Sequence, residues 1–159
     1  MELLSKLFRK EYEALLDSIE GVRPKRYSRH AREALASACR LAHYNGGLLE
    51  PEHLLDALTE ENKSGAFVVL REYGIRRGEI VIPGDFVHMQ GRDLPLRPSS
   101  KTTMAVSAAF VRAITRGELT TGDLLFGLAD MGCLDALFEQ HQVNRQVFRL
   151  SLAANSSEN

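Results

Sequence analysis

An internal repeat constrains the fold of this 159-residue chain more than any other feature. The segment PEHLLDAL at residues 51–58 returns as TGDLLFGL at residues 121–128, an offset of 70 residues, and each copy follows a helix-like segment that glycine ends. Two copies are too few for a solenoid. We therefore expect an all-α bundle with pseudo-twofold symmetry, in which each copy covers the apolar face of the other.

The composition is that of one ordinary globular domain. Hydrophobic residues make up 44% of the chain and charged residues 26%. A chain of this size buries enough surface to hold a core without a disulfide or a metal. The formal net charge of -1 argues against a nucleic-acid-binding domain, because such domains are usually strongly basic. Lys6 and Arg9 interrupt the apolar residues near the N-terminus before they could form a signal peptide or a membrane span. Cys39 and Cys133 belong to no C-x-x-C motif, which predicts two reduced thiols and a cytoplasmic protein.

The N-terminal segment, residues 1–22, predicts an amphipathic helix. Apolar residues recur three and four positions apart between residues 3 and 19, and Gly21 ends the pattern. Such a stripe packs most often on the core of its own chain, and otherwise contacts a partner protein or a second copy in a homodimer. The candidate partner or dimer residues on the stripe are Leu4, Leu7, Phe8 and Leu15.

The first copy of the repeat is expected to span residues 27–75. Ser28 is a good N-cap for a helix that the Asn-Gly-Gly sequence at residues 45–47 ends. Pro51 suits the first turn of the next helix, and a short apolar helix then closes at Gly74.

The second copy is expected to span residues 97–150, with a helix that begins at Pro98. Residues 76–96 separate the copies and are rich in proline and glycine, so they predict a connector with a short extended piece at residues 80–82. Residues 151–159 predict a C-terminal tail, so residues 27–150 make up the repeat domain.

The two copies resemble the Clp N-terminal domain, the substrate- and adaptor-docking module of Clp-type AAA+ unfoldases. The first copy reads YSRHAREALASACRLAHYNGGLLEPEHLLDALTEENKSGAFVVLREYGI and is similar to the first repeat of that family. Its matching residues are Tyr27, Ser28, Ala31, Glu52, His53, Leu54, Leu55, Leu70, Gly74 and Ile75. The second copy matches at Leu96, Pro98, Lys101, Leu124, Leu125, Gly127, Leu128 and Leu137, whereas Gly122 and Asp123 replace the Glu-His pair.

The resemblance implies a non-enzymatic protein-binding module without a cofactor. Its expected partners are a Clp unfoldase, an adaptor or a substrate protein. The sequence contains no G-x-x-x-x-G-K-[ST] phosphate loop, so we expect a stand-alone protein that acts on an unfoldase in trans, or the excised N-terminal part of one. The alternative is an all-helical scaffold or interaction protein with the same fold but no relation to Clp proteolysis, because a fold does not fix a function.

The resemblance also implies a ligand, because some members of the family bind a phosphorylated arginine at each repeat. Ser28 at a helix N-terminus would supply the hydroxyl for the phosphate, and Glu52 the carboxylate for the guanidinium. The simpler interpretation is that both residues only stabilise helix starts. In the second copy we expect Arg97 at the serine position and Gly122 at the glutamate position, and therefore one competent pocket at most.

Basic residues and histidines are the remaining candidates. Basic clusters at residues 23–32 and 71–77 either guide an acidic partner or are solvated helix ends. His53 has no second histidine four residues on, so we expect no metal site and place His53 at the junction between the repeats. The sequence also contains no nucleophile elbow and no dinucleotide fingerprint. The candidate ligand- or peptide-binding residues are thus Ser28, Arg29, Glu52, His53 and Arg97.

Overall fold

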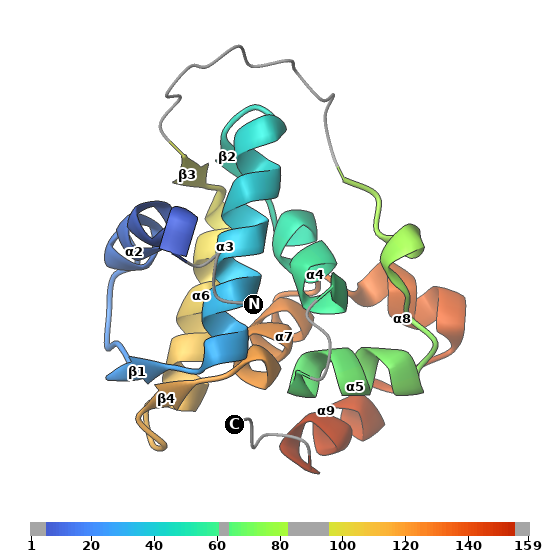
Figure 1. Ribbon diagram of the computed structural model, residues 1–159. Coiled ribbons are helices and arrows are strands. Elements are labelled where there is room, and N and C mark those ends of the chain that lie inside the picture. The colour runs from blue at the N-terminus through green and yellow to red at the C-terminus, as the bar shows by residue number, and fades with distance from the viewer. Residues whose placement is uncertain (1–5, 61–63, 83–95, 155–159) are drawn as a thin grey trace.

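Helices form most of the regular structure, which confirms the all-α fold (Figure 1). The computed structural model describes residues 6–60, 64–82 and 96–154. The helix α2 (Arg9–Asp17) comes first, and the first repeat follows it. That repeat consists of β1 (Arg26–Tyr27), α3 (Arg29–Tyr44), β2 (Leu48–Leu49), α4 (Pro51–Glu60) and α5 (Gly65–Glu72), and the 3-10 turn η1 (Arg77–Glu79) follows it.

The second repeat has the same order of elements. It consists of β3 (Arg97–Pro98), α6 (Ser100–Ala113), β4 (Glu118–Leu119), α7 (Thr121–Asp130) and α8 (Asp135–His141), and α9 (Arg145–Ala154) follows. The helix α6 begins two residues later than expected, because Ser99 caps it while Pro98 lies in β3. The helix α9 continues to Ala154 and buries Leu152 completely, so the first four residues of the expected tail belong to the folded domain.

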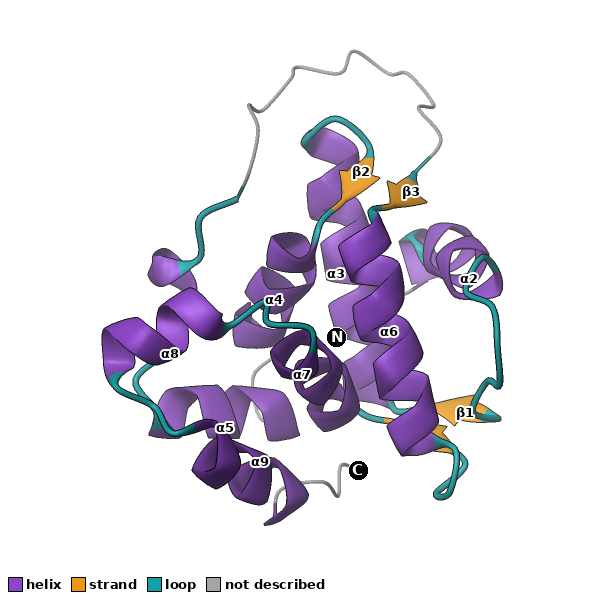
Figure 2. Cartoon of the chain, turned by 180° about the vertical axis from the view of Figure 1, so that it is seen from behind, coloured by secondary structure: helices purple, strands orange, loops and turns teal. Residues whose placement is uncertain are grey.

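Two pairs of very short parallel strands connect the repeats. In β1 and β4, Arg26 lies opposite Glu118, and in β2 and β3, Leu48 lies opposite Arg97. Each repeat therefore pairs its first strand with the second strand of the other repeat. Figures 1 and 2 show the two pairs at opposite ends of α3. This exchange gives the pseudo-twofold arrangement two equivalent junctions, each formed by both repeats.

The core lies where α3 and α6 meet the other helices. Their buried faces consist largely of alanine, which lets the backbones of neighbouring helices approach closely. Phe110 of α6 and Phe148 of α9 are the largest of the fully buried side chains. The ring of Phe148 lies 4.7 Å from that of Phe138 and 5.4 Å from that of Tyr73. The helix α9 therefore covers the core next to α5 and α8.

The apolar stripe of the N-terminal helix packs mainly on the core of its own chain. Leu15 is 4% exposed and Phe8 packs partly against the core, because α2 lies along α3. Leu7 points away and is 64% exposed, and Leu4 lies outside the described residues. Of the four candidate partner residues, Leu7 is therefore the side chain that the structure leaves accessible.

The connector between the repeats differs from the expected one where it is described. Residues 80–82 form no strand, since the chain instead makes the 3-10 turn of η1 just before them. Ile80 packs partly against the core while Val81 is 81% exposed. Residues 83–95 lie outside the described part of the chain.

Candidate ligand site at the repeat junctions

Ser28 lies at the start of α3 and Glu52 beyond its end, and the strands next to them, β1 and β2, lie at opposite ends of α3 (Figure 1). Ser28 caps α3, and its hydroxyl oxygen accepts a hydrogen bond of 3.0 Å from the backbone N–H of Ala31. Glu52 lies in the first turn of α4, which begins after α3 has ended. The two residues therefore do not form one pocket. The reason is the length of α3, whose 16 residues span about 24 Å. The exchange of strands instead brings the start of each repeat to the middle of the other.

Ser99 is the hydroxyl residue that lies near the start of α4. The carbonyl oxygen of Leu49, three residues before Glu52, accepts hydrogen bonds from Ser99 N at 3.0 Å and from Thr102 Oγ1 at 2.7 Å. The N-termini of α4 and α6 therefore lie side by side. Ser99 caps α6 as Ser28 caps α3, so it is the counterpart of Ser28.

The sequence comparison placed Arg97 at the position of Ser28, and the structure shows that this assignment is wrong. Arg97 N bonds to the carbonyl oxygen of Gly47, and Arg26 N bonds to that of Gly117, each at 3.0 Å. Arg97 and Arg26 therefore hold the same position in the two repeats. The Pro-Ser-Ser sequence at residues 98–100 carries the N-cap signal that identifies Ser99.

Glu52 has a free hydrogen-bonding position at this β2–β3 junction. Its Oε2 atom is buried and has no hydrogen-bond partner among the described residues. Glu52 and Lys101 both act electrostatically on the thiol of Cys133, whose pKa is raised mainly by burial, lowered by Lys101 and raised by Glu52. Lys101 lies in the first turn of α6, which starts beside α4, so the carboxylate of Glu52 and the basic, capped start of α6 belong to the same junction. This arrangement can receive a cation at Glu52 and an anion at the start of α6.

His53 lies at the same junction, as expected, and has a structural role there. Its side chain is fully buried, and its Nδ1 atom accepts a hydrogen bond of 2.9 Å from Glu50 N. Its Nε2 atom lies 2.8 Å from Asn45 Oδ1, so Nε2 carries the proton and donates. Burial lowers the pKa of His53 to about 4. The neutral imidazole thus caps α4 instead of facing a ligand.

The β1–β4 junction is filled by arginines of the chain itself. Asp123 replaces His53 there, and its Oδ2 atom accepts a hydrogen bond of 2.9 Å from Thr120 N. Asp123 also forms ion pairs with Arg116 and, at 3.7 Å, with Arg112. Arg112 Nη1 donates to the carbonyl oxygen of Gly122 at 3.2 Å. The guanidinium of Arg112 thus occupies this junction. Gly122 stands where Glu52 stands in the first repeat, so the junction also lacks a carboxylate equivalent to that of Glu52.

The remaining candidate residue, Arg29, is exposed at the first position of α3. Within residues 6–60, 64–82 and 96–154, no group of three or more His, Cys, Asp or Glu side chains is placed to hold a metal ion. In these same ranges no helix combines the length and the apolar character that crossing a bilayer requires.

An apolar groove of about 560 Å³ lies between the end of α2 and the outer face of α6. Its lining includes Ile19 just after α2, Met104 and Val111 of α6, and Met131 after α7. Met104 is 56% exposed and Val111 is 69% exposed. Exposed apolar side chains gathered in one groove are typical of protein-interaction surfaces. Sequence periodicity missed this groove because it predicts one apolar face for each helix, and α6 has a second.

The fold and its junctions define the class: a double-repeat, all-α domain with clefts between its helices. Among solved structures, the chain is similar to the N-domain of ClpV from Vibrio cholerae, with 19% sequence identity and a TM-score of 0.61. The similarity covers 86% of this chain and 92% of that chain. No protein-family model and no curated protein matches the chain. The likeness therefore establishes a fold like that of the ClpV N-domain.

Proposed function

We propose that the chain is a non-enzymatic, cytoplasmic protein-binding module that docks substrates or adaptors for a Clp AAA+ unfoldase, or regulates the unfoldase in trans. The observation that carries this proposal is the double-repeat fold, which aligns with the ClpV N-domain over most of both chains. The apolar groove between α2 and α6 supports a protein as the partner. A scaffold with the same fold but no relation to Clp proteolysis is the alternative.

The proposal predicts that the purified chain binds a Clp unfoldase from the same cell and changes its ATPase or degradation rate. Replacing both Met104 and Val111 by aspartate should weaken this binding about tenfold or more, because the groove would then bury two carboxylates. The matched control replaces Val147 and Leu150 of α9 by aspartate. These side chains are 50% and 70% exposed and lie outside the groove. Binding and rate changes that stay undetectable at saturating concentrations of the chain would favour the scaffold.

Phosphorylated arginine is a second candidate ligand, and we place it at the β2–β3 junction instead of between Ser28 and Glu52. The observation that favours it is the unpartnered Oε2 atom of Glu52 at the junction with α6, whose start Ser99 caps and whose first turn contains Lys101. Glu52 would receive the guanidinium, and Ser99 with Lys101 would receive the phosphate. The β1–β4 junction would not bind this ligand, because its own arginines fill it.

Glu52→Gln is expected to weaken the binding of free phosphoarginine about tenfold, with the melting temperature nearly unchanged, because Glu52 makes no ion pair among the described residues. Isothermal titration calorimetry measures the affinity. Glu72→Gln, an exposed change of equal charge on α5, is the control. If the wild-type chain does not bind phosphoarginine, Glu52 and Ser99 serve only the helix starts.

A further inference from the structure

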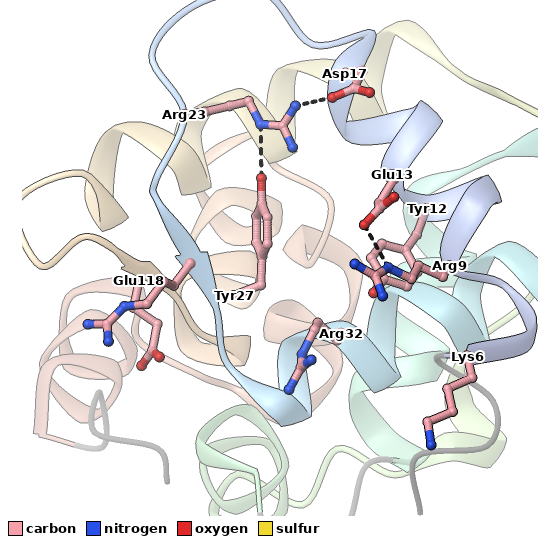
Figure 3. A pocket seen from close by; sticks show the side chains of 10 residues that line it. Lys6, Arg9, Tyr12, Glu13, Asp17, Arg23, Tyr27, Arg32 and Glu118 are labelled. Carbon is pink, nitrogen blue, oxygen red and sulfur yellow. Dashed lines mark hydrogen bonds and ion pairs between the residues drawn. The ribbon is translucent and has the colours of Figure 1, made fainter.

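A polar cleft outside the junctions lies between α2 and the start of α3 (Figure 3). This α2 cleft has a volume of about 550 Å³. Its walls come from α2, from the segment leading into β1, from α3 and from β4, and five basic, three acidic and two tyrosine residues line it. A cleft of this size accommodates several residues of a peptide.

Two ion pairs lie in the α2 cleft, one within α2 and one between α2 and the segment before β1. Arg9 Nε lies 2.9 Å from Glu13 Oε1 on α2. Arg23 pairs with Asp17 of α2, and its Nε donates a hydrogen bond of 3.0 Å to the hydroxyl of Tyr27 on β1. Figure 3 shows Arg23 between these two partners, so its guanidinium connects α2 to β1. Two of the three acidic residues are thereby already neutralised.

The other basic side chains of the α2 cleft have no such partner. In the part of the chain that the structure describes, Lys6, Arg26 and Arg32 form no ion pair with a carboxylate. The remaining acidic residue, Glu118, lies opposite Arg26 in the strand pair. The lining therefore has an excess of two positive charges, five basic residues against three acidic ones.

The start of α3 adds to this positive potential. Its first turn contains no acidic residue, although acidic residues are favoured at the positive end of a helix dipole. Arg29 and Arg32 follow the cap residue Ser28 instead, and Arg32 lines the cleft. A basic residue at this position opposes helix stability, and an anion bound beside it would offset that repulsion.

The two tyrosines supply neutral hydrogen-bond donors. Tyr12 is 4% exposed, and burial, together with the charge of Glu13, raises the pKa of its hydroxyl, which stays protonated. Tyr27 accepts a hydrogen bond from Arg23 through its hydroxyl oxygen, and a phenolic hydroxyl can donate as well as accept. Guanidinium and hydroxyl donors together fit carboxylate oxygens.

We propose that the α2 cleft binds an acidic segment of a protein partner, with Arg26 and Arg32 receiving its Asp or Glu carboxylates. Single-stranded nucleic acid fits less well, because its binding sites stack bases on accessible aromatic rings. Here Tyr12 is 4% exposed and the guanidinium of Arg23 lies over the ring of Tyr27. The proposal deepens the proposed function, since it rests on a protein partner and states which chemistry that partner presents.

The test is fluorescence anisotropy with a short fluorescein-labelled oligoglutamate peptide and the full chain. The wild type should bind the peptide, and added salt should weaken the binding. Replacing Arg26 and Arg32 by glutamine should weaken it about tenfold or more. Both side chains are exposed, so the melting temperature should not change. Arg40→Gln combined with Arg71→Gln is the control, because these exposed arginines lie outside the cleft and the net charge changes equally.

Oligoglutamine and oligothymidylate of the same length complete the test. Binding of oligoglutamate alone, and its loss only in the cleft variant, supports the proposal. An equal loss in the control variant, no binding to the wild type, or tighter binding of oligothymidylate overturns it. The assay contains no unfoldase, so a negative result says nothing about docking to a Clp unfoldase, which the experiment above tests separately. In the same way, a failure to bind an unfoldase would not change the peptide result.

Discussion

Gly127→Ala is expected to destabilise the chain by about 3 kcal/mol or more, because α6 and α7 cross at this glycine with no space for a methyl group. A Cβ atom at Gly127 would lie 2.0 Å from the carbonyl oxygen of Ala105 and 3.2 Å from the backbone nitrogen of Ala109. Both obstacles are backbone atoms of α6, so no side-chain rotation relieves the overlap. Chemical denaturation followed by circular dichroism measures the loss.

Gly122→Ala, in the same helix, is the matched control. A Cβ atom at Gly122 meets only Thr120 Oγ1, at an ordinary contact distance of 3.6 Å. Because alanine favours helices over glycine, this variant should be neutral or more stable by up to about 1 kcal/mol. Equal stabilities of the two variants would mean that α6 and α7 do not cross as closely as described. In the first repeat the counterpart of Gly127 is Ala57, buried on α4, so the close crossing belongs to the second repeat.

Local signals in the sequence predicted several of the helices and the cap of α3. Ser28 and Pro51 mark helix starts through the chemistry of a few neighbouring residues, and the structure confirms both. The repeat itself predicted the bundle, because two copies of one unit must cover each other. These features depend on residues close in sequence, which is why they could be read.

Contacts between distant segments could not be predicted in this way. The strands that connect the repeats have two residues each, too few for the alternation that identifies a strand, and β1 pairs with a segment about 90 residues away. Without the pairings β1–β4 and β2–β3, Ser28 and Glu52 look adjacent and Ser99 is overlooked. The α2 cleft was foreseen only as a basic cluster at residues 23–32, since α2 and β4 complete it.

Asp123→Ala is expected to lower the free energy of unfolding by about 3–5 kcal/mol, because it leaves two arginines without their buried carboxylate. The side chain of Asp123 is fully inaccessible, and Arg112 and Arg116 both pair with it. The variant also removes the acceptor for Thr120 N and thus half of the capping box of α7. Thermal and urea denaturation measure the effect.

The control for Asp123 is Asp130→Ala in the same helix. Asp130 pairs with Arg149 at 2.9 Å, but its side chain is 35% exposed, so its loss should lower stability by about 1 kcal/mol or less. A third variant separates the charge from the cap. Changing Arg112 and Arg116 to methionine together with Asp123→Ala removes every charge of the cluster, and much of the lost stability should return. If stability instead falls further, the arginines stabilise the β1–β4 junction independently of Asp123, through contacts such as that of Arg112 with the ring of Phe126 at 4.7 Å.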